Sequence, residues 1–435
     1  MARKKVLIIT YYWPPSGGSG VQRWVKFTKY LRNFGWEPII YTPSNPEFPV
    51  YDDSLAKDIP KDIEVLRTPI WEPYSFYKKF LGLKPESRIG AGLTMEEKHN
   101  SFLQAVSVWI RGNFFIPDAR KFWIKPSVKF LNRYLSEHPV DAIVTNGTPH
   151  SLHLIGLKLK QKTGLPWLAD FRDPWTNIDF FEDLRLTRRA RKKHHTLEKI
   201  VLETADVVTV TTPGTKRDFE KLADSNVHVI TNGFDEDDFK EISVEPDEKF
   251  TISHIGVLTP SRNHPFLWDT FRELMKENES FARDFKLRLI GNVDISIRKE
   301  IIRQGLEKHV EFVNYIPHEQ IIIEEKKSHV LLLIIRNAPN ANTILPGKIF
   351  EYIAARRPVI AIGPAESDTA SLLRENKCGA TFSSEHKEQL KKEILRLYAA
   401  YTTHADTALH PEHIQNYTRY NLTERLAKLL DHISV

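Results

Sequence analysis

A lysine and a glutamate three residues apart form the part of the sequence best suited to an anionic ligand. Lys348 and Glu351 follow Pro346, which suits the first turn of a helix. A lysine at the amino end of a helix can contact a diphosphate, because that end already attracts anions. Glu351 lies one turn later on the same face and can accept hydrogen bonds from the two vicinal hydroxyls of a ribose. The same spacing also fits an ordinary surface Lys–Glu pair on a capped helix, so spacing alone does not decide.

An arginine after another predicted strand adds a second cation. Arg262 closes a stretch that begins with the apolar run 251–255 and turns at Gly256. A guanidinium binds phosphate through two parallel hydrogen bonds. One arginine is weak evidence, but two cations and a carboxylate on loops after the strands of one sheet form a stronger constellation.

A glycine-rich loop near the amino terminus is a second place for an anion. Gly17-Gly18-Ser19-Gly20 follows the apolar run 5–10 and opens a helical pattern, so its amides can approach a phosphate. The loop departs from the dinucleotide-binding fingerprint, because Arg23 stands where the third glycine belongs and no acidic residue follows the second strand. An ordinary tight turn is the alternative.

Charged residues directly follow the apolar strand 167–170. The segment Asp170-Phe171-Arg172-Asp173-Pro174-Trp175 is expected to face the crevice where ligands bind in such sheets. Because buried charges are costly unless paired, Arg172 and Asp173 either serve the ligand or form a structural pair that holds the loop. His150, on the neighbouring strand-to-helix loop, is either a base or a hydrogen-bonded residue at a helix start.

Three other features point to no site of comparable strength. The acidic run 235–238 lies at the start of a helix, where capping explains it. The single cysteine and the scattered histidines have no zinc spacing, so no metal site is predicted. The basic run 185–195 fits a solvated helix face, and a membrane-facing or acceptor-binding patch is the alternative.

The composition predicts a two-domain protein. The chain has 435 residues, of which 41% are hydrophobic and 27% charged, and a single core stops growing at roughly 250–300 residues. One cysteine excludes an internal disulfide and suits a reducing compartment. No apolar stretch approaches the ~20 residues that span a bilayer. The net charge of +6 fits anionic ligands or a weakly anionic membrane and is too small to imply nucleic acid.

Short apolar runs alternate with helical patterns, which predicts α/β domains with parallel sheets covered by helices. The first domain is expected over 1–244, with an aromatic and basic insertion at about 70–135, and the second over 245–411. The last amphipathic helix, within 412–435, is expected either to cap the second domain or to cross back to the first. The predicted strands are 5–10, 37–41, 142–145, 167–170, 207–210, 227–230, 251–255, 287–290, 310–313, 330–335 and 359–362.

At these motifs the chain resembles glycosyltransferase family 4, which comprises retaining group 1 glycosyltransferases of the GT-B fold. The resemblance covers nearly the whole length and implies two Rossmann-like, doubly wound domains that face a central crevice. The segments that carry it are Tyr11–Pro15 with the glycine loop, Pro117–Arg120, Ala169–Trp175, Thr231–Asp235, Gly256 with Arg262, and Gly347–Tyr352.

The resemblance also implies residue roles. Arg262 and Lys348 would hold the donor diphosphate and stabilise the leaving phosphate, which would help to deprotonate the acceptor hydroxyl. Glu351, matching the second glutamate of the family's paired-glutamate motif, would bind the ribose. The predicted site residues are Arg262, Lys348, Asp173 and Arg172 for catalysis; Gly17, Gly18, Gly256, Arg262, Thr343, Ile344, Lys348 and Glu351 for the donor; and His150, Asp173 and Trp175 for the acceptor, without a metal.

The chain departs from the family pattern at three places. Thr343 stands where the first glutamate of the pair is expected, and that glutamate usually touches the donor sugar, so the sugar is not predicted. A histidine common after the equivalent strand is replaced near Arg172. Arg356 or Arg357 replaces a glycine that usually precedes the proline of the next strand; a positive φ there would cost about 1 kcal/mol.

The leading hypothesis is a metal-independent, retaining glycosyltransferase that moves a hexose-type sugar to a glycan or lipid-linked acceptor, in surface polysaccharide or glycoconjugate synthesis. The donor is expected to be a UDP- or GDP-linked sugar, used as co-substrate without a further cofactor. We expect a cytoplasmic protein with peripheral contact to the inner face of an anionic membrane and no nucleic-acid partner. The alternatives are a nucleotide-sugar epimerase of the same fold and a non-catalytic sugar- or nucleotide-binding relative. Retention of Arg262, Lys348 and Glu351 together argues against the latter.

Overall fold

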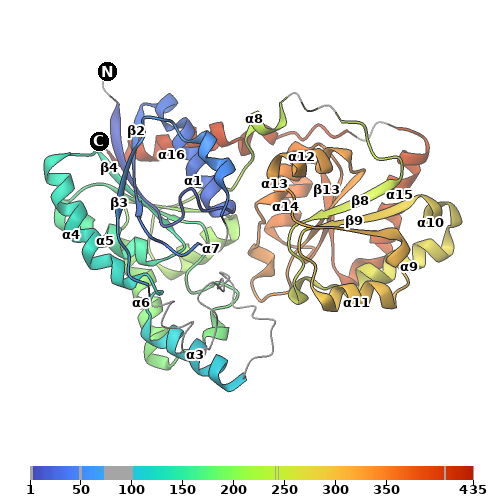
Figure 1. Ribbon diagram of the computed structural model, residues 1–435, viewed down its shortest axis with the longest axis horizontal. Coiled ribbons are helices and arrows are strands. Elements are labelled where there is room, and N and C mark those ends of the chain that lie inside the picture. The colour runs from blue at the N-terminus through green and yellow to red at the C-terminus, as the bar shows by residue number, and fades with distance from the viewer. Residues whose placement is uncertain are drawn as a thin grey trace. The chain divides into compact units, whose positions relative to one another are not determined.

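The computed structural model describes residues 3–48, 51–72, 101–240, 242, 244–405 and 408–434. The chain forms two compact units (Figure 1). Unit 1 comprises Met1–Thr231 together with Arg419–Val435, and unit 2 comprises Asn232–Thr418. Each unit contains one parallel sheet, as the alternation of apolar runs and helical patterns predicts.

Unit 1 contains a seven-stranded sheet in the order β3-β2-β1-β4-β5-β6-β7, in which all pairs are parallel. The order reverses direction between β1 and β4, which is where ligands bind in doubly wound sheets. The strands are β1 (Lys4–Ile9), β2 (Trp36–Pro43), β3 (Glu64–Thr68), β4 (Ala142–Gly147), β5 (Trp167–Phe171), β6 (Val207–Val210) and β7 (Val227–Val229).

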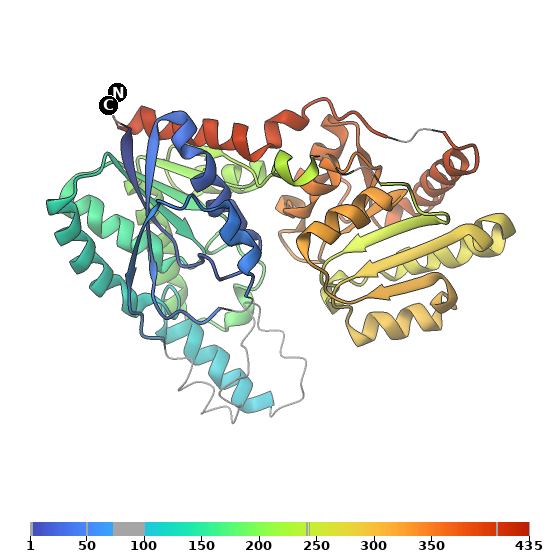
Figure 2. The same cartoon turned by 45° about the horizontal axis from the view of Figure 1, so that its top comes forward.

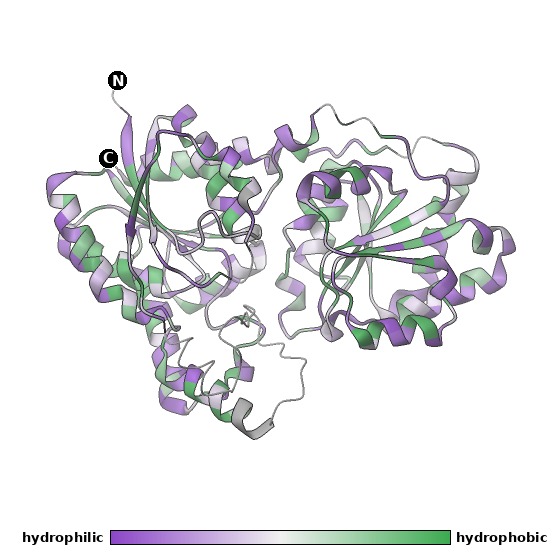
Figure 3. Ribbon diagram, viewed as in Figure 1, coloured by the Kyte–Doolittle hydropathy of each residue, from purple (hydrophilic) through white to green (hydrophobic). Residues whose placement is uncertain are grey.

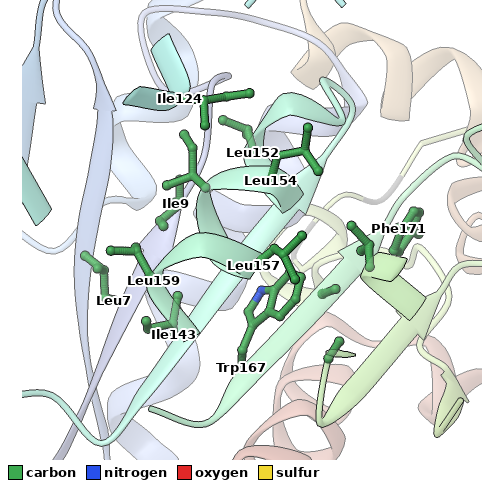
Figure 4. Packing of buried hydrophobic residues seen from close by; sticks show 14 of the residues in the cluster. Leu7, Ile9, Ile124, Ile143, Leu152, Leu154, Leu157, Leu159, Trp167 and Phe171 are labelled. Carbon is green, nitrogen blue, oxygen red and sulfur yellow. The ribbon is translucent and has the colours of Figure 1, made fainter. Parts of the chain in front are cut away.

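Helices cover both faces of this sheet. On one face α4 and α5 bury apolar side chains against β1, β4 and β5 (Figure 4). On the other face lie α1 and α16, which pack against each other (Figure 2). The α-helices described in unit 1 are α1 (Ser19–Leu31), α3 (Ser101–Phe114), α4 (Lys121–Glu137), α5 (Ser151–Thr163), α6 (Arg188–Thr204), α7 (Pro213–Leu222) and α16 (Arg419–Ile433).

Unit 2 contains a six-stranded parallel sheet in the order β10-β9-β8-β11-β12-β13, which reverses between β8 and β11. Purple and green residues alternate along the helices of both units in Figure 3, as expected for helices with one exposed and one buried side. The strands are β8 (Phe250–Ile255), β9 (Phe285–Ile290), β10 (Val310–Val313), β11 (Val330–Ile334), β12 (Val359–Ile362) and β13 (Gly379–Phe382). The α-helices are α8 (Glu236–Phe239), α9 (Pro265–Glu277), α10 (Glu279–Asp284), α11 (Ile295–Arg303), α12 (His318–Lys327), α13 (Lys348–Ala354), α14 (Asp368–Glu375) and α15 (Lys387–Thr402).

The predicted fold class, two Rossmann-like doubly wound sheets, is confirmed. Two strands were not predicted, β3 and β13, and both lie at a sheet edge where several residues stay partly exposed. Such strands lack the continuous apolar run of strands that are covered on both faces. Arg356, which was singled out as the replacement of a glycine, has a φ of +58°.

The unit boundaries fall at 231/232 and 418/419. The last helix therefore belongs to unit 1, where Leu422, Leu426 and Leu430 are buried in the core with α1. The predicted insertion at about 70–135 includes α4, whose Trp123 and Leu131 are buried against the sheet. α4 thus belongs to the layer that covers the sheet, and part of the remaining insertion, 73–100, lies outside the described residues.

A buried ion pair joins three parts of unit 1. The guanidinium of Arg23, on α1, contacts both carboxylate oxygens of Asp170, at 3.0 and 2.9 Å, and both side chains are 1% exposed. The Asp170 carboxylate also accepts hydrogen bonds from Trp24 Nε1 and Thr209 Oγ1. Arg23 donates further to the carbonyl of Thr231, the last residue of this part of unit 1. Asp170, expected to face the ligand crevice, instead holds α1 against the sheet.

Removing one partner of this pair should destabilise unit 1. In the variant Arg23→Met the carboxylate of Asp170 stays buried without its cation, and we expect a loss of about 3–5 kcal/mol in the free energy of unfolding. Urea denaturation followed by tryptophan fluorescence measures it, because every tryptophan except Trp268 lies in unit 1. The control is Arg133→Ala, in an exposed pair, for which we expect a change within about 0.5 kcal/mol. Equal small losses in both variants would contradict the importance of the buried pair.

Candidate functional site

The predicted donor residues of unit 2 gather at the carboxyl ends of its central strands. Gly256 directly follows β8, and Lys348 begins α13 after the loop that follows β11. These are the two strands between which the strand order reverses. The site therefore lies at the topological switch point of the sheet, the usual ligand position in this architecture.

A glycine makes room for the lysine. The ammonium of Lys348 donates a short hydrogen bond to the carbonyl of Ile255. Gly256 has a φ of +122°, and a side chain at this position would collide with Lys348 Nζ. Both the backbone conformation and the close approach thus require glycine. The spacing of Gly256 and Lys348, which are far apart in sequence, had suggested only that both lie on the same edge of the sheet.

Burial and one neighbouring cation act on the ammonium of Lys348. Its side chain is partly accessible, yet the surrounding protein removes water from it and lowers the pKa of Lys348 to about 8. The positive charge of Arg262 acts in the same direction, whereas Glu351 and Glu325 oppose it. Arg262 lies at the end of a short 3-10 helix, Pro260–Arg262, and its Nη1 donates to the carbonyl of Val257 at 2.7 Å. A diphosphate would compensate the two neighbouring cations.

Glu351 has a partner that the sequence did not suggest. His318, the first residue of α12, places Nε2 2.9 Å from Glu351 Oε1. The carboxylate of Glu351 remains 20% exposed, so it can still accept from a ligand. The signal that could have identified His318 is its position directly after the strand 310–313, on the same edge of the sheet as Lys348.

A carboxyl group that was not predicted lies near this site. Glu325, on α12, is fully buried, and neither of its carboxyl oxygens has a hydrogen-bond partner among the described residues. Burial, and then the negative charge of Glu351, raise the pKa of Glu325 well above its usual value, while Lys348 opposes the shift. Glu325 is therefore protonated over a wider pH range than an ordinary glutamate.

The residues just before Lys348 form a compact loop. Thr343 ends a short 3-10 helix, Ala341–Thr343, and its hydroxyl donates to the carbonyl of Asn340 at 3.0 Å. The carbonyl of Ile344 accepts from Thr369 Oγ1 at 2.8 Å. Both predicted donor residues thus have contacts within unit 2 that fix the loop leading to α13.

Unit 1 brings the glycine loop together with the charged loop after β5. Gly18, with a φ of +99°, precedes α1. A side chain at Gly20 would collide with the guanidinium of Arg172, so the loop packs directly against this side chain. Gly17 is partly exposed in the same loop. These residues follow β1 and β5, on the carboxyl edge of the sheet.

Arg172 and Asp173 form an ion pair at this edge. Arg172 Nη2 lies 2.8 Å from Asp173 Oδ2, and Thr148 Oγ1 donates to the same oxygen at 3.1 Å. Burial opposes ionisation of Asp173, but the guanidinium of Arg172 prevails and lowers the pKa of Asp173. The side chains are 20% and 41% exposed, so the pair both holds the loop and remains accessible.

The other acceptor candidates, His150 and Trp175, lie beneath that loop. Their rings stack at 5.0 Å and are 6% and 2% exposed. Burial lowers the pKa of His150 to about 4, so the imidazole is neutral near pH 7. Trp175 Nε1 donates to His194 Nδ1 at 3.0 Å. Neither ring presents a broad face to solvent, and Arg172 and Asp173 are the more accessible groups of this cluster.

Two aspartates from the sequence motifs have structural roles. Asp235 caps α8 by accepting from the amide of Asp237. Asp118 accepts from the amide and the hydroxyl of Ser151, at the start of α5. Across the described ranges, no group of three or more His, Cys, Asp or Glu is placed to hold a metal ion. In the same ranges, no helix combines the length and the apolar character needed to cross a bilayer.

Sequence comparisons match both halves of the chain. The family model described as Glycosyltransferase Family 4 matches residues 91–238, and the model described as Glycosyl transferases group 1 matches residues 249–400. No curated protein sequence was found to match.

Solved structures share the whole architecture at low sequence identity. WaaG, a glycosyltransferase involved in lipopolysaccharide biosynthesis, has 15% identity and a TM-score of 0.58, with 98% of this chain and 99% of that chain covered. A structure described as trehalose-6-phosphate from E. coli, bound with UDP-2-fluoro glucose, has 10% identity, 99% coverage of both chains and a TM-score of 0.60. A putative UDP-N-acetylglucosamine 2-epimerase from Listeria monocytogenes has 12% identity, covers 98% and 95%, and has a TM-score of 0.54. The likeness establishes the GT-B fold, which hosts more than one reaction.

The buried carboxyl group of Glu325 should make the stability of unit 2 depend on pH. A carboxyl group whose pKa is raised on folding contributes stability that is complete below its unfolded pKa and lost as the pH rises toward the folded pKa. Relative to Glu325→Gln, the unmodified protein should lose about 1.4 kcal/mol per pH unit over that range.

Hydrogen exchange of the β8 and β11 amides from pH 5 to pH 8 measures this difference. The exposed Glu307→Gln is the control and should follow the unmodified protein. A difference between Glu325→Gln and the unmodified protein that stays constant with pH would show that Glu325 ionises normally.

Proposed function

Because the chain belongs to the group 1 glycosyltransferases of family 4, we propose that it transfers a sugar from a nucleotide-sugar donor to a glycan or lipid-linked acceptor with retention of configuration. The observation that carries the proposal is the cluster of Gly256, Arg262, Lys348 and Glu351 at the switch point of unit 2. It combines two cations with one carboxylate, the groups that a nucleoside diphosphate requires.

In this proposal each side chain of the cluster has one task. Lys348 and Arg262 bind the diphosphate and stabilise the negative charge that develops on the leaving phosphate. Glu351 accepts hydrogen bonds from the ribose hydroxyls. His318 positions the Glu351 carboxylate through the 2.9 Å contact. The cations perform the task that a divalent metal has in other transferases, so the reaction is proposed to be metal-independent.

The acceptor is proposed to bind near the exposed ion pair of unit 1. Asp173 can accept a hydrogen bond from an acceptor hydroxyl, while Arg172 holds its carboxylate ionised. The departing phosphate would take the proton of the attacking hydroxyl, so no dedicated base is needed. Gly17 and Gly18 offer backbone amides that can contact phosphate.

The donor class and the setting complete the proposal. The E. coli neighbour is bound with UDP-2-fluoro glucose, which supports a UDP-linked hexose ahead of a GDP-linked one. WaaG is involved in lipopolysaccharide biosynthesis, which supports a role in surface polysaccharide or glycoconjugate synthesis. Such synthesis would place the protein in the cytoplasm, at the inner face of the membrane.

Nucleotide binding tests the donor site directly. UDP, GDP, ADP, CMP and dTDP are screened by thermal shift, and a nucleotide at 100 times its dissociation constant should add about 2.7 kcal/mol of stability. Glu351→Ala and Arg262→Ala should each weaken the best nucleotide about ten-fold, since a hydrogen bond to a charged group is lost. The exposed Arg303→Ala, on α11, is the matched control. If no nucleotide shifts the unfolding temperature, the enzyme proposal fails; if one binds and these variants bind equally well, the site is misplaced.

The pKa of Lys348 gives nucleotide binding a pH dependence. Below about pH 8 the ammonium is charged and can bind the diphosphate; above it the free protein loses this charge. The dissociation constant of UDP should therefore rise by roughly ten-fold per pH unit above pH 8. Calorimetric titration between pH 7 and pH 9.5 measures it. Lys348→Met should bind weakly at every pH, and a dissociation constant of the unmodified protein that stays flat across pH 8 would contradict the role of Lys348.

A further inference from the structure

Unit 1 exposes a continuous group of aromatic side chains around the end of α3 and the start of α4. The contacts between rings run from Trp71 to Phe122 at 4.7 Å, from Phe122 to Phe115 at 6.0 Å, and from Trp109 to Phe114 at 5.7 Å. Lys121 connects the two parts, since its ammonium lies over the rings of Phe115 and Phe122 and donates to the carbonyl of Phe114. We call these residues the aromatic cluster: Trp71, Trp109, Phe114, Phe115, Lys121 and Phe122.

The aromatic cluster is unusually exposed. Trp71 is 61% exposed, Phe114 59%, Trp109 40% and Phe122 39%. Single exposed apolar side chains are normal, but a contiguous group of large rings indicates a surface that is covered in use. Tryptophan and phenylalanine are the residues that enter the interfacial layer of a bilayer.

A row of cations lies next to the aromatic cluster. Arg188, Arg189, Lys192 and Lys193 are exposed at the start of α6, and no ion pair is recorded for them among the described residues. The neighbouring Arg191 is paired, with Glu182 at 2.6 Å. We call the four cations the basic face.

Hydrogen bonds fix the basic face beside the aromatic cluster. Asn113, near the end of α3, accepts from the amide of Thr187 at 2.8 Å and donates to the carbonyl of Arg185 at 3.3 Å. Burial, and then the charge of Lys193, lower the pKa of Lys121, which shows that α6 brings its cations close to the rings. Figure 1 shows α3 and α6 together at one end of unit 1.

We propose that the aromatic cluster and the basic face dock unit 1 onto the surface of an anionic lipid bilayer. The combination favours lipid over an acidic protein or a nucleic acid. The four exposed rings require an apolar layer, the four cations require negative charges, and an anionic bilayer offers both. Docking of this kind requires no helix that spans the bilayer, and the structure has none among the described residues. It also does not involve the donor site of unit 2. The inference names the surface behind the membrane location proposed above, and its test does not depend on the transfer reaction.

Vesicle flotation of the full chain tests the proposal. Phosphatidylcholine vesicles with roughly one third phosphatidylglycerol should bind the protein, those of phosphatidylcholine alone should bind it weakly, and added salt should reduce binding. The charge variant Lys192→Gln/Lys193→Gln and the ring variant Trp71→Ser/Phe114→Ser should each bind on the order of ten-fold more weakly. Binding that ignores lipid charge would overturn the proposal.

Matched controls lie in unit 2. Ile295 and Ile302 on α11 are 67% and 60% exposed, and the variant Ile295→Ser/Ile302→Ser removes these apolar side chains. The variant Lys299→Gln/Lys392→Gln removes one cation from α11 and one from α15. These variants should bind vesicles like the unmodified protein, and equal losses would overturn the proposal. If the unmodified protein is a dimer and the ring variant is a monomer that binds vesicles equally well, the surface binds a second copy and the proposal is wrong. Circular dichroism checks that each variant is folded. The result of the vesicle test does not depend on whether the protein binds a nucleotide.

Discussion

The buried pair between Arg23 and Asp170 is the interaction on which unit 1 depends. Two full charges have left water there, which is tolerable only because each makes several further hydrogen bonds. The pair fixes α1, and with it the glycine loop, to the end of β5. It also ties down the carbonyls of Ile230 and Thr231, where the chain leaves unit 1. The pair thus anchors β5 near its carboxyl end, which leaves Arg172 and Asp173, in the loop that follows, with a defined position from which to act.

Both units use glycine in the same way. In unit 1 the absence of a side chain at Gly20 admits the guanidinium of Arg172, and in unit 2 the absence of one at Gly256 admits the ammonium of Lys348. In each case the glycine comes soon after the first strand of its sheet, and the cation follows a strand beyond the switch point. A glycine-rich turn in such a protein therefore does not have to touch the ligand itself. It can act by letting a cation from another part of the sheet approach the backbone.

Local patterns and long-range contacts differ in how well they can be predicted from the sequence. The central strands were predictable because they are covered on both faces and form continuous apolar runs, whereas the partly exposed edge strands β3 and β13 gave no such signal. The pair Lys348 and Glu351 was recognisable because helical spacing is local. Glu325 was not, since it reaches this site only through the packing of α12 against the same sheet. For His318 the one signal was its position after β10, which places it at the same sheet edge but does not show its contact with Glu351. Asp170 was expected at the crevice because its distant partner, Arg23, could not be read from spacing.

The charges around the donor site connect its two cations with two carboxyl groups. Lys348 and Arg262 repel each other, and this repulsion would be strongest when no anion is bound. Glu351 and Glu325 offset it, and the four groups sum to no net charge if both carboxyl groups are ionised. Burial already favours the protonated form of Glu325 in the free protein, and the charge of Lys348 opposes it. A diphosphate that neutralises Lys348 would remove this opposing influence and favour protonation further. Anion binding at Lys348 and protonation of Glu325 are thus coupled through charge, because both respond to the same ammonium group.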